Sequence, residues 1–216
     1  MVGQTGAVDA KDSVTSTSVL SGENSGIPTL QARVNLATRS LEFALWVHHA
    51  EEETEAAIAG ETDFTSSLVG MDFFVSVYED KVWVHGEYWK GENLSDVRGG
   101  IAQGVHPTSG VEIESKGGWI EIGLKVSEVY SVTIGYSTDD PKDSDLGAAA
   151  VAAPAGFSSA YATSGASKNK ILFTSHTLNF KPVVIGFELL SWDTQYVGSI
   201  GDGDALRFKA YIAYIF

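Results

Sequence analysis

The chain ends on Ala205-Leu-Arg-Phe-Lys-Ala-Tyr-Ile-Ala-Tyr-Ile-Phe216, and this stretch decides the fold. Alternate residues of a β-strand lie on the same face. One face of this strand would therefore be apolar, and the opposite face carries Arg207 and Lys209. Strands with one apolar and one charged face also occur in soluble antiparallel sheets, so the rest of the chain has to show what surrounds the apolar face. That face would carry Leu206, Phe208, Ala210, Ile212, Tyr214 and Phe216.

Eight other segments have a similar length and alternation, and together with the last one they predict an all-β protein of about nine antiparallel strands. In 28–37, for example, apolar side chains alternate with Gln31, Arg33 and Asn35. Residues 1–26 are rich in Gly, Ser and Thr and are expected to form a flexible segment or loop before a β-domain over 27–216. The eight segments are 28–37, 40–51, 65–78, 81–94, 111–126, 129–138, 169–180 and 182–196.

The connections between these segments alternate between short and long. Transmembrane β-barrels have short periplasmic turns at one end and long external loops at the other. The pattern therefore favours an antiparallel up-and-down transmembrane β-barrel. If Phe216 is periplasmic, residues 1–26 are extracellular. Bacterial barrels have an even strand number, so nine strands predict part of a larger barrel, unless a strand in 1–26 escapes detection. The short connections are 38–39, 79–80, 127–128 and 181–182, and the longer ones are 52–64, 95–110, 139–168 and 197–204.

The composition excludes several classes of function. Asp and Glu total 28 against 14 Lys and Arg, and the net charge of −14 argues against nucleic acid and against peripheral binding to anionic lipid. There is no cysteine, so disulfides and thiolate metal sites are excluded. Met1-Val-Gly-Gln-Thr-Gly6 lacks the features of a signal peptide. The signal has been removed, the chain is cytosolic, or it is a piece of a longer protein.

Six local patterns follow one another along residues 28–216. Their order and spacing resemble the C-terminal half of porin-like outer-membrane proteins of Gram-negative-type bacteria. The patterns are Gly86-Glu-Tyr-Trp-Lys-Gly-Glu-Asn-Leu94, Gly99-Gly-Ile-Ala-Gln-Gly-Val105, Glu112-Ile-Glu-Ser-Lys-Gly-Gly-Trp119, Gly135-Tyr-Ser-Thr-Asp-Asp-Pro141, Ser191-Trp-Asp-Thr-Gln-Tyr196 and Tyr214-Ile-Phe216.

The resemblance implies a bacterial outer-membrane channel that allows passive diffusion of small hydrophilic solutes or ions. It also implies contact with outer-membrane lipid, suggests a homotrimer, and gives Tyr214 and Phe216 the role of an assembly signal in the terminal strand. It names no solute. The missing signal peptide and N-terminal strands depart from the family pattern.

The polar faces of the strands would line the lumen. Carboxylates outnumber cations there, which predicts a weak preference for cations. The alternative is that these residues form the wet face of a soluble or secreted all-β, lectin-like binding module. A third interpretation is a structural barrel with a filled lumen, but small residues such as Gly123 and Thr133 favour a water-filled one. The predicted pore-lining residues are Arg33, Glu42, Asp72, His85, Glu87, Glu114, Glu121, Lys125, Glu188, Arg207 and Lys209.

Aromatic residues near the strand ends predict two girdles at the membrane interfaces. Trp46 is expected to break the pattern, because it falls on the polar face. The outer girdle would comprise Trp46, Tyr88, Trp89, Tyr136, Trp192 and Tyr196, and the inner one Trp83, Tyr130, Tyr214 and Phe216.

No pattern of catalytic or metal-binding residues is convincing. Carboxylates in 139–145 are of the type that binds Ca²⁺, yet the stretch lacks the Gly and the final Glu of an EF-hand loop, so an acidic, solvated turn is the better interpretation. His48 and His49 face opposite ways on a strand. No Gly-x-Ser-x-Gly elbow is present. We predict no enzyme and no cofactor, although a spatial triad needs no fixed spacing. The weak metal candidates are Asp139, Asp140, Asp143 and Asp145.

Overall fold

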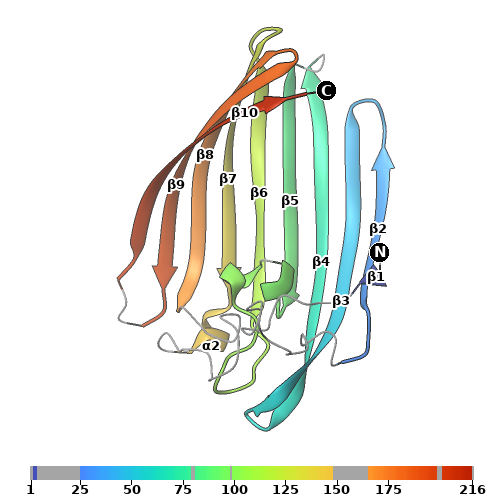
Figure 1. Cartoon of the computed structure of the whole chain (residues 1–216), viewed down its shortest axis with the longest axis vertical. Helices are drawn as coiled ribbons and strands as arrows, with labels where there is room; N and C mark the ends of the chain where they lie inside the picture. The colour runs from blue at the N-terminus through green and yellow to red at the C-terminus, as the bar shows by residue number, and fades with distance from the viewer. Residues whose placement is uncertain are drawn as a thin grey trace.

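The computed structural model describes residues 2–3, 25–78, 81–97, 99–147, 165–198 and 201–215. They form a single ten-stranded sheet in which each strand pairs antiparallel with the next one in sequence. This arrangement confirms the all-β prediction (Figure 1). The strands are β1 (Val2–Gly3), β2 (Thr29–Ala37), β3 (Leu41–Ile58), β4 (Glu61–Tyr78), β5 (Val82–Glu92), β6 (Glu114–Lys125), β7 (Tyr130–Pro141), β8 (Ala166–Phe180), β9 (Val183–Tyr196) and β10 (Gly203–Tyr214).

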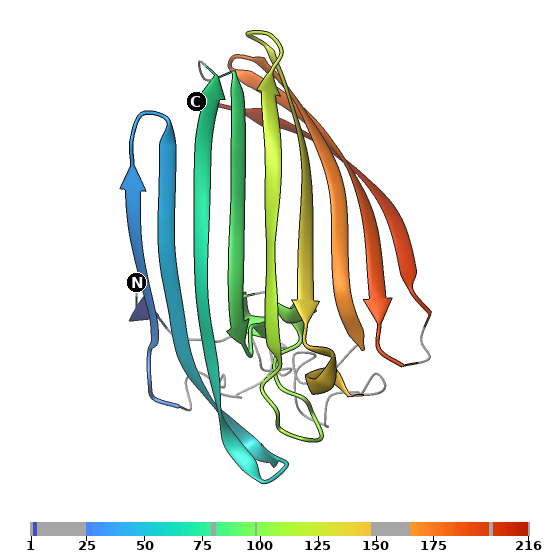
Figure 2. The ribbon, with the colours of Figure 1, turned by 180° about the vertical axis from the view of Figure 1, so that it is seen from behind.

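Three short helical turns complete the described chain: η1 (Ser95–Val97), η2 (Gly100–Ala102) and α2 (Asp143–Leu146). They lie at the end of the sheet that carries the long connections, which we call the loop end. Tight connections such as 38–40 and 181–182 mark the opposite, turn end (Figures 1 and 2). None of the helices in the described residues is long and apolar enough to cross a membrane.

Two parts of the chain differ from the sequence prediction. The expected loop over 52–64 is wrong, because β3 and β4 continue to a two-residue turn at Ala59 and Gly60, which have φ angles of 54° and 94°. The sequence did not reveal this hairpin, because the acidic residues 51–55 do not alternate between apolar and polar side chains. Val2–Gly3 pairs with Leu30 and Thr29 as an unexpected strand. Residues 4–24 of the predicted flexible segment lie outside the described residues.

The register assigns each side chain to one of two faces, because residues directly opposite each other in an antiparallel pair point the same way. We call the face of Arg33 the polar face and the face of Val34 the apolar face. Several apolar-face residues are strongly exposed, including Val34 (77%) and Ile212 (76%). One row across the apolar face runs Leu36, Phe43, Phe73, Gly86, Ile120, Tyr136, Leu172, Ser191 and Leu206.

His176 is a polar residue on the apolar face, and its neighbours satisfy it. Its Nδ1 lies 2.7 Å from the Tyr130 hydroxyl, and its Nε2 lies 3.3 Å from the Thr174 hydroxyl. The ring stacks on those of Tyr130 and Phe187, with interplanar angles of 10° and 14°. Hydrogen bonding and stacking of this kind lower the cost of a polar group in apolar surroundings.

The sheet is curved but open. η1 and η2 lie in front of the strands in Figure 1 and behind them in Figure 2, so they occupy the inner side of the curve. The inner side is the polar face, because η2 contacts Asp139 there. One edge of the sheet is β2 with β1 and the other is β10; β10 begins on the opposite side of the molecule and slants across it, so that its C-terminal end overlaps the turn end of β4 and β5 in Figures 1 and 2.

Glycines lie directly opposite aromatic residues at several positions in the sheet. A Cβ on Gly123 would lie 1.9 Å from the ring of Trp83, and one on Gly70 would lie 2.4 Å from the ring of Trp46. The rings therefore cover the glycines and lie along the sheet instead of projecting from it. This arrangement keeps the inside of the curve open. The pairs on the polar face are Trp46–Gly70, Trp89–Gly117, Trp83–Gly123, Phe173–Gly135 and Tyr211–Gly186.

The same pairing corrects the predicted aromatic girdles. All five tryptophans lie on the polar face, so Trp46, Trp83, Trp89 and Trp192 do not belong to an outward girdle. Tyrosines do lie on the apolar face, at Tyr88, Tyr130, Tyr136 and Tyr214. The large indoles of Trp46, Trp83 and Trp89 lie over glycines of the neighbouring strand on the inner side. Alternation along one strand does not reveal this pairing, because it says nothing of the residue on the neighbouring strand.

Candidate functional site

All but one of the predicted pore-lining residues share the polar face. The exception is Glu114, which the register places on the opposite face from the other ten. Glu114 pairs with Glu92 on the apolar face, and its carboxylate lies 3.1 Å from Lys90 Nζ. Glu121 comes seven positions after Glu114, and an odd difference in position places two residues of one regular strand on opposite faces. The ten residues on the polar face are Arg33, Glu42, Asp72, His85, Glu87, Glu121, Lys125, Glu188, Arg207 and Lys209.

An ion pair joins β2 to β4 across the intervening strand. The Arg33 guanidinium donates two hydrogen bonds to the Asp72 carboxylate, at 2.5 and 2.8 Å. Ala44 on β3 is directly opposite Asp72 and is 1% exposed. Its small side chain leaves room for Arg33 to reach over the strand. Asp72 is itself opposite Glu87, so the guanidinium also offsets the repulsion between two adjacent carboxylates.

A histidine and a carboxylate lie close together beside this cluster. His85 Nδ1 is 3.8 Å from Glu121 Oε1, and the imidazole packs edge-on against the rings of Trp119 and Phe74. The rings fix the position of the histidine, while its side chain keeps 39% exposure. The inner wall of β4 to β6 therefore presents fixed charges to the space inside the curve.

Charge of the opposite sign is concentrated at the far edge of the sheet. Arg207 and Lys209 lie on β10, and Lys209 Nζ is 3.4 Å from Glu188 Oε2 on β9. Lys125 lies at the turn end and pairs with Glu128 at 3.0 Å. The carboxylates of β3 to β6 and the cations of β10 thus face the same space from different sides. Such a distribution produces a transverse field that acts on ions.

Residues 93–113 cross the polar face at the loop end, and we call them the crossing segment. The main-chain N–H of Ile101 donates to Asp139 Oδ2 on β7 at 2.7 Å. The Gln103 amide donates to the Ala166 carbonyl on β8 at 2.9 Å. At the other side, the Asn93 amide lies 3.4 Å from Glu52 Oε2 on β3. The segment therefore bridges strands that are far apart in the sheet and narrows its inner space.

The best-buried apolar side chains of the described chain hold this segment in place. Leu94, Ile113 and Leu146 are 0% exposed, and Val105 is 1% exposed. Burial of side chains of this size contributes roughly 1.5–3 kcal/mol each. The sequence predicts an external loop over 95–110. It does not identify Gln103, Asn93 and Glu52 as site residues, and it presents Asp139 only as a weak metal candidate, because the partners of these residues are distant in sequence.

Glu112 links the crossing segment to β4 and should make stability depend on pH. Its carboxylate accepts a hydrogen bond from the Thr65 main-chain N–H. Burial nevertheless raises the pKa of Glu112 above the ordinary 4.5. The folded state then binds a proton more readily than the unfolded state, so Glu112 favours folding below pH 4.5 and loses this effect as pH rises through the folded pKa.

We therefore expect Glu112→Gln, which keeps an oxygen acceptor for Thr65, to remove part of the fall in stability as pH rises above 4.5. Urea unfolding of both proteins at a series of pH values, followed by tryptophan fluorescence, measures this. Equal slopes of unfolding free energy against pH would contradict the expectation. Asp202→Asn is a suitable control, because it removes an exposed carboxylate between β9 and β10.

The acidic stretch 139–145 does not form one cluster. Asp139 lies on the polar face, where Ser115 Oγ donates to it at 3.0 Å. Asp140 lies on the apolar face, opposite Lys116. Asp143 and Asp145 lie in α2, and Asp145 Oδ1 is 3.3 Å from Lys142 Nζ. In the ranges that the structure describes, no three His, Cys, Asp or Glu side chains come together as a metal site.

The proposed assembly residues are described in part. Tyr214 lies on the apolar face opposite Val183 and is 59% exposed. Phe216 lies outside the described residues.

Comparison with known proteins gives no match to a family model, to a curated protein or to a solved structure.

Proposed function

We propose that this chain forms the wall of a porin-like channel in a bacterial outer membrane, through which small hydrophilic solutes or ions diffuse passively. The apolar face would contact lipid and the polar face would line the water-filled lumen. Each solute would pass the crossing segment at the loop end.

The observation that carries the proposal is the exposure of the apolar face. In the described part of the chain, the extensive contacts between strands join neighbours in the sheet, and η2 packs on the polar side. Leu206 and Phe208 are 72% and 67% exposed, and residues of this kind occur on every strand from β2 to β10. Each Å² of such surface costs roughly 25 cal/mol in water. Lipid removes this cost over the whole face at once.

The open edges extend the proposal. Among the residues that the structure describes, no strand lies beside the outer edge of β10, and β2 pairs with β1 only at Thr29 and Leu30. Unpaired strand edges do not occur in the hydrocarbon region of a membrane. We propose that further strands, from the same protein or from a second copy, pair with these edges and complete a larger barrel.

Refolding into detergent tests the membrane assignment. We expect unheated protein in dodecyl maltoside to migrate differently from boiled protein on a denaturing gel, and protein kept in detergent-free buffer to lack this difference. A stable monomer that folds without detergent would contradict the proposal, because its apolar face would then tolerate water or be covered by other parts of the same chain. That outcome would favour the soluble binding module.

Ion selectivity tests the lumen assignment. Because Glu121 lies on the polar face, we expect Glu121→Gln to lower the preference for cations over anions in a planar bilayer. Glu114→Gln is a matched control on the same strand, since Glu114 lies on the opposite face. Reversal potentials at about 0.1 M salt, where the screening length is ~10 Å, measure the difference. Equal shifts for the two variants would show that the polar face does not line the conducting path.

Removing the basic residues of β10 should change the ion preference in the opposite direction. Arg207→Gln combined with Lys209→Gln should raise the cation preference in the same assay, because it leaves the carboxylates of β3 to β6 unopposed. An unchanged reversal potential in this double variant would place β10 away from the ion path.

A further inference from the structure

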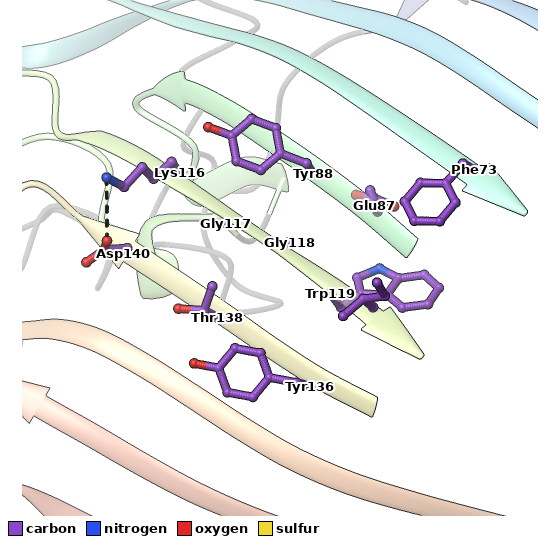
Figure 3. Close-up of a pocket in the computed structure, with 11 residues that line it drawn as sticks. Phe73, Glu87, Tyr88, Lys116, Gly117, Gly118, Trp119, Tyr136, Thr138 and Asp140 are labelled. Atoms are coloured by element: carbon purple, nitrogen blue, oxygen red, sulfur yellow. Dashed lines mark ion pairs between the residues drawn. The ribbon is translucent and has the colours of Figure 1, made fainter. Parts of the chain in front are cut away.

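A groove of about 340 Å³ lies on the apolar face near the loop end of β5 to β7. Tyr88 and Tyr136 stand on its two sides, and Phe73 lies toward its turn end (Figure 3). Lys116 and Asp140 lie at its loop end. The groove therefore has an apolar body and one charged end.

A glycine creates the groove. Gly118 on β6 pairs with Tyr88 on one side and with Thr138 on the other. A Cβ at Gly118 would lie 2.2 Å from the Glu87 main-chain oxygen, so the position accepts no side chain. Tyr88 and Tyr136 remain 45% and 40% exposed. The strand direction sets the long axis of the groove, since Lys116, Gly118 and Ile120 are successive residues on this face.

The charged end has more cations than its nearest carboxylate can neutralise. Asp140 Oδ2 is 3.7 Å from Lys116 Nζ and 3.3 Å from Lys168 Nζ, so two ammonium groups share one carboxylate. Their side chains are 58% and 32% exposed and can therefore contact another anion. Lys90 lies on the same face but is paired with Glu114.

We propose that this groove binds a lipid with an anionic phosphate headgroup. One acyl chain would lie over Gly118 between Tyr88 and Tyr136, and the phosphate would contact Lys116 and Lys168. Lysine side chains reach toward a headgroup in this way because their methylene stems tolerate apolar surroundings. The inference rests on the proposed function, in which the apolar face contacts the membrane.

Charge complementarity selects the anionic lipid over a neutral one. A chain with a net charge of −14 repels anionic headgroups in general. Two ammonium groups that share the Asp140 carboxylate beside an apolar groove therefore make one position favourable on an otherwise unfavourable surface. We therefore expect anionic lipid to bind at this groove although the net charge of the chain disfavours such binding elsewhere.

Thermal unfolding in neutral detergent tests the inference. We expect phosphatidylglycerol to raise the unfolding temperature more than phosphatidylcholine with the same acyl chains, and inorganic phosphate to have no comparable effect. Equal effects of the two lipids would overturn the proposal. A full effect of inorganic phosphate alone would show a simple anion site and would also overturn it.

Two variants examine the two halves of the site. Lys116→Gln combined with Lys168→Gln should weaken apparent binding of phosphatidylglycerol roughly tenfold, the loss expected for one charge-assisted hydrogen bond. Thr138→Phe should weaken it by filling the groove while leaving both lysines in place. Lys125→Gln combined with Lys209→Gln removes the same charge from the polar face and should leave binding unchanged.

The outcomes separate this inference from the proposed function. If the heat-modifiable band forms in detergent and the two lipids act alike, only the lipid site is wrong. If no such band forms, the membrane assignment and the lipid site fail together. Equal losses in the polar-face control and in the Lys116 and Lys168 variant would reduce the effect to net charge and would overturn the site.

Discussion

Asp139→Ala is expected to release the crossing segment and to raise the conductance of the proposed channel. Asp139 accepts hydrogen bonds from the Ile101 N–H at 2.7 Å and from Ser115 Oγ at 3.0 Å. Loss of a partner for a buried donor costs roughly 1–3 kcal/mol. Ile101 also has a φ of 55°, which is unusual for a β-branched residue and needs support from its surroundings.

Single-channel conductance and hydrogen exchange of the Ile101 amide, which donates to Asp139, measure this result. Asp139→Asn keeps one carbonyl oxygen and should have a smaller effect. Asp143→Ala removes an exposed carboxylate of the same acidic stretch and serves as the control. Unchanged conductance and unchanged amide exchange in Asp139→Ala would show that other contacts hold the segment.

Gly117→Val is expected to destabilise the sheet strongly. A Cβ at this position would lie 2.3 Å from the Trp89 ring and 2.7 Å from the Thr138 main-chain oxygen. The ring can move, but the oxygen belongs to the neighbouring strand and cannot. Overpacking of this kind typically costs about 1–3 kcal/mol, and occasionally more. Urea unfolding in detergent measures the loss.

Gly123→Val offers a graded comparison. The nearest atoms to its Cβ all belong to the Trp83 side chain, so the indole can turn inward instead of breaking the sheet. We expect a smaller loss of stability than for Gly117→Val, together with a lower conductance, because the displaced indole occupies the lumen. Gly201→Val is the control, since nothing lies within 4 Å of its Cβ. Equal stability of the Gly117 and Gly201 variants would contradict the role of the glycine–aromatic pairs.

Alternation along the chain was sufficient to predict most of the strands and which charged residues share a face. Arg33, Asp72, Glu87 and Glu121 share a face because each strand has a period of two, and this depends only on neighbouring residues. Glu114 had been grouped with Glu121 on one face, but the pairing of β5 with β6 places the two residues on opposite faces. The turn end was predicted for the same local reason, whereas the β3–β4 hairpin was missed.

The crossing segment shows what alternation does not reveal. Ile101 and Asp139 are 38 residues apart, and Asn93 and Glu52 are 41 apart. Nothing in the local pattern of either partner identifies the other. The same holds for Trp89 over Gly117 and for the groove above Gly118, which exist only once three strands are in register.

The sequence by itself thus determined an all-β chain, the order of its strands and the sorting of its charges from its apolar side chains. Each of these follows from the backbone pleat, which repeats every two residues. The tertiary structure decided the curvature, the inward position of the tryptophans, the path of residues 93–113 and the groove between Tyr88 and Tyr136. Those features depend on which residues the register places side by side, and the turns between adjacent strands, together with their hydrophobic pattern, set that register.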